Sequence, residues 1–152
     1  MPKTLANKAD LEQICRRFGA LTPESPRMWG KMSVGGMVCH LHDSYQLALG
    51  ERIASPVRLP IPGRVIKYVA LRTSLPWAKN MRSAREMQQE SGGTQPAAFE
   101  ADQKRLLQTI VRFSKCESLH QVAHPFFGAM SSSDWLRWGY LHADHHLRQF
   151  RG

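Results

Sequence analysis

Apolar residues recur at helical spacing in four segments of the chain, which predicts four amphipathic helices. The predicted helices cover about residues 8–21, 33–49, 97–116 and 131–150. In the first of them, Leu11, Ile14 and Phe18 stand at i, i+3 and i+7, so that they share one helix face. We therefore expect each helix to bury one apolar stripe against its neighbours.

Polar and glycine residues mark the ends of two of these helices. Ser33 is a suitable N-cap for the second helix, and Gly50 stands where a helix commonly ends. Before the fourth helix, Ser131 and Asp134 have the spacing of a capping box. The helix boundaries are thus indicated by local chemistry as well as by periodicity.

The connection between the second and third helices lacks regular periodicity from residue 51 to residue 93. Proline and glycine interrupt it repeatedly, at Pro56, Pro60, Pro62, Gly63, Pro76, Gly92 and Gly93. Within it, only residues 64–71 indicate a helical turn or two, and no strand alternation or hairpin signal competes anywhere in the chain. A connection this long inside a compact domain usually has a functional role. We expect one all-α domain over residues 1–152: a helix bundle or, alternatively, an irregular helical fold.

The composition is that of an ordinary globular protein. The 152 residues are 42% hydrophobic, and no apolar run approaches the ~18–20 residues that a membrane span needs. The first residues contain no apolar core of a secretory signal. Cys15, Cys39 and Cys116 are odd in number and widely spaced, which favours reduced thiols. These features predict a cytoplasmic protein without a membrane segment.

The net charge of +9 is concentrated in the irregular connection. Between Glu51 and Glu86 the chain has eight basic residues and no acidic ones: Arg52, Arg58, Arg64, Lys67, Arg72, Lys79, Arg82 and Arg85. Such a cluster can contact nucleic acid, attract anionic small molecules, or form a solvated loop. No helix-turn-helix, zinc-finger or RNA-recognition motif accompanies it, so nucleic acid is the less favoured partner.

The histidines carry the candidate chemistry. His142 and His146 stand at i and i+4, so on a helix they face the same way, one turn apart. Two imidazoles so placed can bind one metal ion at about 2.0–2.1 Å. The motif is not that of the zinc proteases, because Asp144 does not occupy the position of their catalytic glutamate. A His-x-x-x-His pair also occurs in helices for packing reasons alone.

A third ligand has to come from a facing helix. His40, in the middle of the second helix, lies about 100° from Leu41 and could point along the edge of the core. It could equally be a hydrogen-bonded, half-buried histidine. His42 falls nearer the polar side and is expected in solvent or behind the ligands.

Several motifs together resemble those of a known superfamily. They are Trp29-x-x-Met32-Ser33-x-Gly35-Gly36-Met37-x-x-His40-Leu41-x-Asp43-Ser44, His124-Pro125-x-Phe127-Gly128, Trp135, and His142-x-x-His145-His146-Leu147-Arg148-Gln149-Phe150. From about residue 11 to residue 150 the chain resembles the DinB/YfiT-like superfamily, and more narrowly a branch classed as a domain of unknown function. The resemblance implies an up-down-down-up four-helix bundle with a long connection between helices two and three. It also implies a divalent metal bound by His40, His142 and His146.

Other polar residues have roles that depend on that metal site. Three imidazoles leave at least one coordination position open, as in catalytic sites. His145 is a competing ligand; alternatively it orients a partner or packs at the edge of the bundle. Asp43 and Asp144 are candidates to accept a hydrogen bond from the N–H group of a ligand imidazole, although solvated helix faces explain both equally well. His124 is the candidate catalytic acid or base, because an ordinary imidazole titrates near pH 6.5; a purely structural turn is the alternative.

The resemblance implies a metal-dependent enzyme, either a hydrolase or a transferase that uses a low-molecular-weight thiol. The metal would be Zn²⁺, Ni²⁺, Fe²⁺ or Mn²⁺, the thiol a second cofactor, and the substrate a small molecule, anionic if the basic segment forms the mouth of the site. One alternative is a binding module whose segment 52–85 contacts nucleic acid or an acidic partner. Another is a vestigial site in a structural homodimer.

Overall fold

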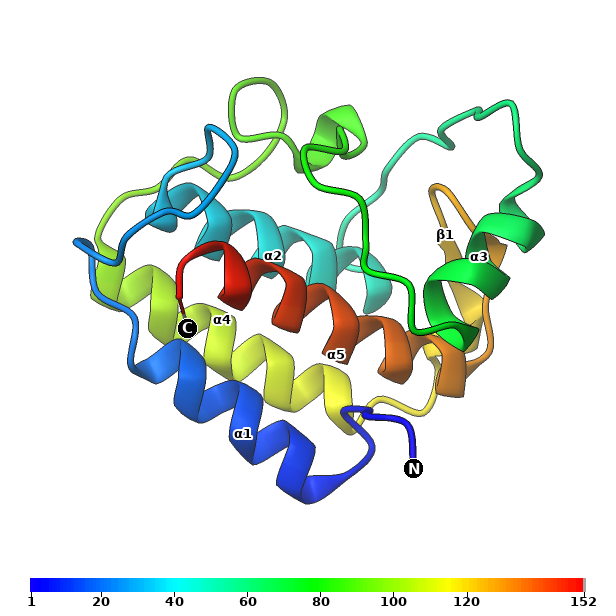
Figure 1. Ribbon diagram of the computed structural model, residues 1–152, viewed down its shortest axis with the longest axis horizontal. Coiled ribbons are helices and arrows are strands. Elements are labelled where there is room, and N and C mark those ends of the chain that lie inside the picture. The colour runs from blue at the N-terminus through cyan, green and yellow to red at the C-terminus, as the bar shows by residue number, and fades with distance from the viewer. Residues whose placement is uncertain (152) are drawn as a thin grey trace.

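The computed structural model describes residues 1–151, and this part of the chain is mostly helical (Figure 1). It contains five α-helices, two short 3₁₀ turns and one two-stranded sheet within those residues. The α-helices are α1 (Lys8–Gly19), α2 (Val34–Ala48), α3 (Gly63–Arg72), α4 (Phe99–Ser114) and α5 (Ser132–Gln149); the 3₁₀ turns are η1 (Arg85–Met87) and η2 (Leu119–Gln121); the strands are β1 (Ala123–His124) and β2 (Gly128–Ala129). In the described range, no helix combines the length and the apolar content needed to cross a membrane.

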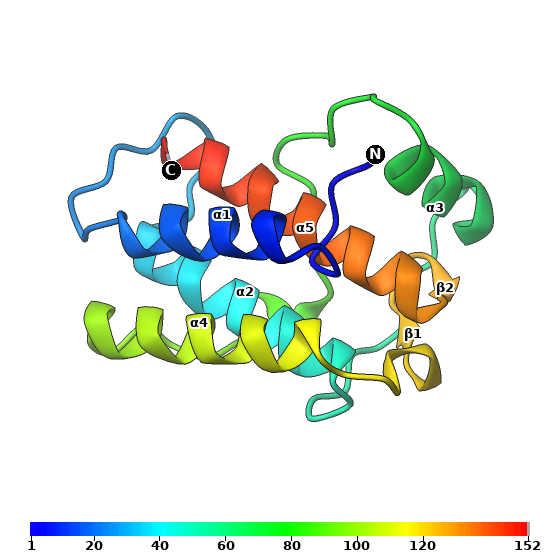
Figure 2. The same cartoon turned by 90° about the horizontal axis from the view of Figure 1, so that it is seen from below.

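The four long helices pack together around one core. α2 contacts α4 and α5, and α1 contacts the same two helices, as the views of Figures 1 and 2 show. The largest fully buried side chains come from all four helices and include Ile14, Phe18, Met37, Leu41, Tyr45, Leu106, Ile110, Phe113 and Trp135. The all-α expectation is therefore met by helices whose apolar stripes face one another.

α5 approaches its neighbours closely at one glycine. A Cβ atom on Gly139 would lie 2.6 Å from Cε1 of Phe113 and 2.9 Å from Cδ1 of Leu5. At the same level, the buried hydroxyl of Tyr45 on α2 donates a hydrogen bond to the Gly139 carbonyl at 2.7 Å. The hydrogen bond joins α2 to α5, which matters because both helices carry the candidate metal ligands.

The expected helix ends are confirmed. The Ser33 hydroxyl accepts a hydrogen bond from the Gly36 N–H at 2.9 Å, and Gly50 adopts a φ of +75° just after α2. At the start of α5, the Ser131 hydroxyl accepts from the Asp134 N–H, and the Asp134 carboxylate accepts from the Ser131 N–H. Local capping chemistry therefore decides where these helices begin and end.

Two elements differ from the sequence-based expectation. The turn or two expected over 64–71 is the complete helix α3, which lies against the beginning of α5. The expectation of no strands is wrong: β1 and β2 form an antiparallel pair, with Ala123 opposite Ala129 and His124 opposite Gly128. Two-residue strands are too short to leave a period-two pattern in a sequence.

Candidate metal centre

Three histidines from two helices converge in the interior. His40 comes from the middle of α2, and His142 and His146 come from successive turns of α5. Their ligand nitrogen atoms all lie within 4.8 Å of one another, and Nε2 of His40 lies 3.2 Å from Nε2 of His142. Tetrahedral coordination with bonds of 2.0–2.1 Å places two nitrogen ligands roughly 3.3 Å apart. The spacing of these two atoms therefore suits a shared metal ion.

Hydrogen bonds fix the tautomer of two of these imidazoles. Nδ1 of His40 lies 3.0 Å from the carbonyl oxygen of Met87, which can only accept, so Nδ1 carries the proton and donates. Nδ1 of His146 lies 2.8 Å from Oε1 of Gln149, whose Nε2 donates to the Trp29 carbonyl at 3.1 Å. In both rings the lone pair therefore resides on Nε2. This is the arrangement that metal-binding histidines usually show.

His142 is positioned by packing instead. Its Nδ1 atom is buried and has no hydrogen-bond partner among residues 1–151. The ring is packed against Trp138 at 4.7 Å and Trp77 at 5.9 Å between ring centroids, and it lies 5.0 Å from the ring of His146. Two tryptophan rings packed against it thus restrict the orientation of this imidazole.

Burial keeps the three imidazoles neutral. It lowers the pKa of His40 below the usual value, and it lowers the pKa values of His142 and His146 well below that value. The neighbouring imidazoles lower the last two further, because a positive charge on one ring disfavours a second. A neutral imidazole is the form that binds a metal, so the chemistry of this donor set fits a divalent cation.

Asp43 anchors the segment that contacts His40. This carboxylate has no exposed surface, and it accepts hydrogen bonds from N and Oγ1 of Thr94 at 2.7 Å and 2.6 Å. It also forms an ion pair of 3.0 Å with Arg52. The interactions tie the end of the 85–94 segment to α2, and Met87 belongs to that segment.

Arg52 extends the same network. Its guanidinium donates to the carbonyl oxygens of Glu86 and Gly92, both at 3.3 Å, and to Oγ1 of Thr94 at 3.0 Å. No hydrogen bond joins Asp43 to an imidazole among the described residues. Asp43 therefore supports His40 indirectly, because it positions the segment that contains Met87, and the Met87 carbonyl accepts a hydrogen bond from the His40 imidazole.

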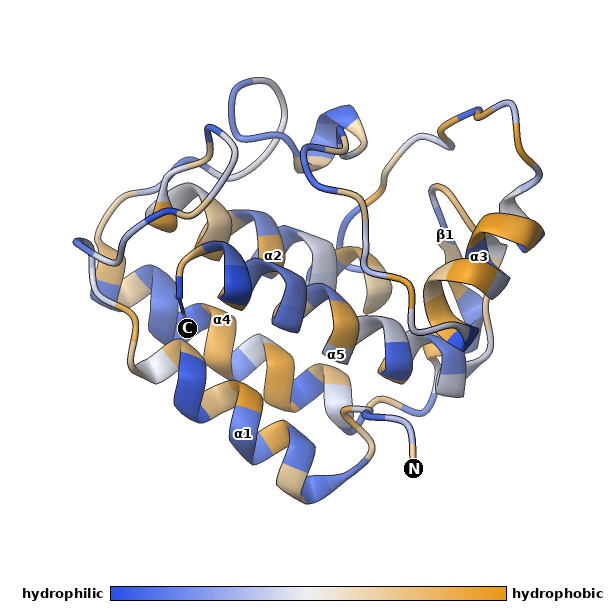
Figure 3. Ribbon diagram, viewed as in Figure 1, coloured by the Kyte–Doolittle hydropathy of each residue, from blue (hydrophilic) through white to orange (hydrophobic). Residues whose placement is uncertain are grey.

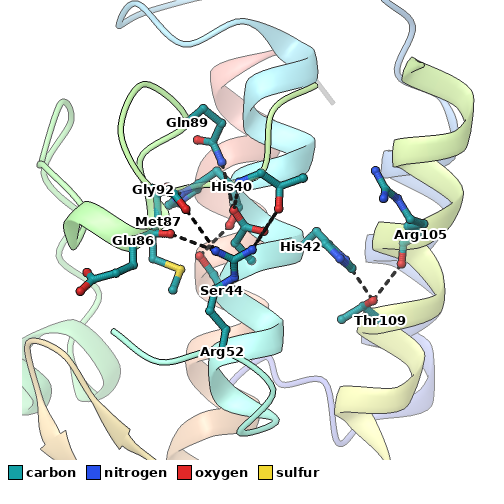
Figure 4. Close-up of polar contacts among 12 residues, drawn as sticks. His40, His42, Ser44, Arg52, Glu86, Met87, Gln89, Gly92, Arg105 and Thr109 are labelled. Atoms are coloured by element: carbon teal, nitrogen blue, oxygen red, sulfur yellow. Dashed lines mark hydrogen bonds and ion pairs between the residues drawn. The ribbon is translucent and has the colours of Figure 1, made fainter. Parts of the chain in front are cut away.

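Asp144, His42 and His145 do not belong to the cluster of three ligands, although the ring of His145 lies 5.3 Å from that of His146 and lines the cavity beside them. Asp144 forms ion pairs of 2.7 Å with Arg17 of α1 and with Arg148, and within residues 1–151 it accepts no hydrogen bond from an imidazole. Nδ1 of His42 lies 3.1 Å from Oγ1 of Thr109, so His42 faces α4 and not the other histidines (Figure 4). His145 contacts the edge of Trp29, with 5.7 Å between ring centroids.

His124 makes the contacts of a structural turn and also lies at the cavity. Its Nδ1 accepts hydrogen bonds from the N–H groups of Phe126 at 3.2 Å and Phe127 at 3.3 Å, which shapes the β1–β2 turn. Its ring stacks on Phe127 at 4.2 Å, and it also lines the cavity at the three ligands, with Trp138 between it and His142. Burial lowers the pKa of His124 to about 3, so the ring is neutral and carries its proton on Nε2.

A cavity of about 1230 Å³ opens beside the histidine cluster. Its floor contains His40, His142 and His146, and its walls come from α3, the 74–84 segment, the β1–β2 turn and the 29–33 segment. Trp77, Met87 and Gln149 line it as well. No role was assigned to these three from the sequence. Trp77 and Met87 reach the histidines only in the folded chain, whereas the i, i+3 spacing of His146 and Gln149 is a local signal that could have indicated their contact.

Comparison with known proteins places the chain in a family. A family model described as "Protein of unknown function (DUF1569)" matches residues 4–152. The chain belongs to DUF1569. No curated protein and no solved structure matches it. The expected relation to an uncharacterised family is confirmed, and the wider relation to the DinB/YfiT-like superfamily stays a prediction.

The basic segment of this DUF1569 chain does not form a uniformly basic surface. Arg52 is paired with Asp43, Lys67 and Arg72 pair with Asp134, and Lys79 lies 4.6 Å above the ring of Trp29: contacts that hold the connection in place. The structure describes all eight basic side chains between residues 52 and 85, and of these only Arg82 lines the cavity. A further basic residue, Lys31 from the loop before α2, lines it too. A broad nucleic-acid face gains no support from this arrangement.

Proposed function

We propose that this DUF1569 protein is a metal-dependent enzyme in which His40, His142 and His146 hold one divalent ion. The observation that carries the proposal is the convergence of three neutral imidazoles, within 4.8 Å, at the floor of a cavity large enough for a substrate. Three protein ligands leave a position open for a reactant, which distinguishes catalytic from structural zinc sites. Zn²⁺, Ni²⁺, Fe²⁺ and Mn²⁺ all accept imidazole ligands.

We also propose that the four long helices form the up-down-down-up bundle of the DinB/YfiT-like superfamily. Support comes from the mutual packing of α1, α2, α4 and α5 and from the long connection between α2 and α4. It comes also from the ligand pattern, with one histidine on α2 and two, one turn apart, on α5. α3 and the β1–β2 pair are then additions that build the cavity walls.

The reaction we propose is hydrolysis or the transfer of a low-molecular-weight thiol to an electrophile. A divalent ion bound by the three histidines would supply Lewis-acid activation of a water or a thiol. Nε2–H of His124 can donate a hydrogen bond to a substrate in the cavity. Because its pKa lies near 3, His124 acts as a neutral donor at physiological pH and not as a protonated acid. Arg82 and Lys31 favour an anionic substrate.

Metal analysis tests the proposal. The protein is purified without chelators, reloaded separately with the four ions, desalted, and analysed by mass spectrometry of the elements. We expect close to one ion per chain, lost in His142→Ala and retained in His42→Ala, a matched control whose imidazole faces α4. Circular dichroism verifies that both variants keep their helices. Protein that retains no ion after reloading with any of the four metals would refute the site.

Activity assays then separate the two reactions. Hydrolysis of nitrophenyl esters, or conjugation of a small thiol to chlorodinitrobenzene, is measured for the reloaded protein and for His142→Ala. Turnover that depends on both the metal and His142 assigns the reaction. Turnover that persists in the metal-free protein contradicts a role for the ion in catalysis.

A further inference from the structure

One wall of the cavity is unusually apolar and exposed. Val65 and Val69 on α3 have 45% and 39% of their surface exposed, and Ile61, Leu75 and Met81 beside it have 53%, 63% and 57%. All five line the cavity. Figure 3 shows α3 as a largely hydrophobic element on the outside of the molecule. Single exposed apolar side chains are ordinary, but a group that lines one cavity is typical of a ligand site.

The other side of α3 is anchored, so the direction of its apolar side is determined by the fold. At the C-terminal end of α3, Arg72 forms an ion pair of 2.6 Å with Asp134 at the start of α5, and on the side away from the valines Lys67 donates a hydrogen bond to the Ala129 carbonyl at 2.9 Å. Leu71 is buried on the same side, with 3% exposed. These contacts direct Val65 and Val69 away from the protein core and into the cavity.

The end of the cavity near Trp29 differs in charge. Lys31 and Arg82 line it there, and the loops that carry them meet where Gly30 approaches Asn80: a Cβ atom on Gly30 would lie 3.1 Å from Oδ1 of Asn80. The cavity thus has two cations on neighbouring loops and an apolar wall along α3, with the histidines between. Its volume of about 1230 Å³ exceeds the roughly 300–1,000 Å³ of most small-molecule sites, which leaves room for an extended ligand.

We propose that the cavity binds an amphipathic carboxylate, with its hydrocarbon body along Val65, Val69 and Leu75 and its anionic head beside Lys31 and Arg82. The hydrocarbon body of the ligand would then pass the three histidines, where the proposed reaction takes place. This inference rests on the proposed function for the reaction only, because apolar burial and charge attraction hold the ligand without a metal. Burial of the hydrocarbon body supplies the binding free energy, and the two cations select a head group of negative charge.

Fluorescence titration tests the proposal on the full chain after chelator treatment. The probe is dansylaminoundecanoate, and the competitors are dodecanoate, dodecyltrimethylammonium and butyrate, all below their micelle-forming concentrations. We expect one probe per chain and displacement by dodecanoate. Dodecyltrimethylammonium should compete at least about tenfold more weakly, because its head has the wrong sign. Butyrate should not compete, because it has almost no apolar body. Absence of probe binding, or equal competition by all three, overturns the proposal.

Two aspartate substitutions on α3 localise the ligand. Val69→Asp places a charge in the apolar wall and should weaken dodecanoate binding at least about tenfold. Tyr68→Asp on the same helix is the matched control: Tyr68 is 64% exposed, lies outside the cavity lining, and should change affinity less than about twofold. Equal weakening by both variants, or none by Val69→Asp, overturns the proposal. Both replaced side chains are substantially exposed, and circular dichroism verifies that the variants fold.

The outcome is separable from that of the metal experiment. Dodecanoate binding in protein that holds no metal after reloading would support this inference and refute the proposed metal site. One ion per chain without dodecanoate binding would do the reverse. Arg82→Gln adds an internal check, since it should weaken dodecanoate and leave dodecanol unchanged; the same loss for both ligands contradicts the placement of the head group.

Discussion

Replacing Asp43 by asparagine tests how the protein supports His40. The substitution keeps the size of the side chain and removes a negative charge that has no exposed surface. Asp43 accepts two hydrogen bonds from Thr94 and pairs with Arg52, and an asparagine retains one acceptor oxygen only. Hydrogen bonds to charged groups contribute about 1.5–3 kcal/mol each. Because Arg52 is 24% exposed and partly compensated by water, we expect a loss of about 2–4 kcal/mol in the free energy of unfolding.

The same substitution should weaken metal binding without touching a ligand. Loosening of the 85–94 segment moves the Met87 carbonyl away from Nδ1 of His40, and the imidazole then loses the contact that fixes its tautomer. Changes to groups that orient a ligand typically reduce metal affinity 10- to 100-fold. We expect a reduction in that range for Asp43→Asn.

Asp144→Asn is the matched control. Asp144 also pairs with arginine, and it stands between the two ligands of α5 in the sequence, yet it faces Arg17 of α1. Urea unfolding gives the stability of each variant, and competition with a chromogenic chelator gives its zinc affinity. If Asp43→Asn binds zinc within about twofold of the natural protein, or if Asp144→Asn loses as much affinity, the supporting role of Asp43 is refuted.

Two further substitutions test the fold around the site. The pKa of His124 near 3 lies below the unfolded value near 6.5, so between these limits the unfolded chain binds more protons. The free energy of unfolding of chelator-treated protein should therefore fall with decreasing pH, by up to roughly 1.4 kcal/mol per pH unit from this group alone. His124→Asn can still accept hydrogen bonds from the Phe126 and Phe127 N–H groups, and it should remove that contribution when unfolding in urea is measured across this pH range. An unchanged dependence of stability on pH in the variant contradicts the assignment. Gly139→Ala should lower the free energy of unfolding by at least about 1–3 kcal/mol, seen as a lower Tm, because its Cβ would lie 2.6 Å from the Phe113 ring. Gly19→Ala is the control: its Cβ position has open space around it, so Tm should stay unchanged or rise. Similar effects of the two substitutions would contradict the packing argument.

Features that depend on near neighbours along the chain could be predicted from the amino-acid sequence. Helical periodicity predicted α1, α2, α4 and α5, and the Ser131–Asp134 spacing predicted the capping box that begins α5. The spacing of His142 and His146 likewise put both imidazoles on one face of that helix. These outcomes follow from the 3.6-residue period and from capping hydrogen bonds over a few residues, both of which are written locally in the chain.

The contacts of the polar side chains, in contrast, depend on how the whole chain folds. Nothing in the local sequence directs Nδ1 of His40 to the carbonyl of Met87, or Asp43 to Thr94 in place of an imidazole. α3 was underestimated for the same reason: Lys67 and Arg72 tie it to residues about sixty positions away. The eight cations of the connection were visible in the sequence, but not that four of them make contacts that stabilise the fold: Arg52, Lys67, Arg72 and Lys79. Such pairings depend on which segments the buried apolar faces bring together, so they emerge only when the whole chain is packed.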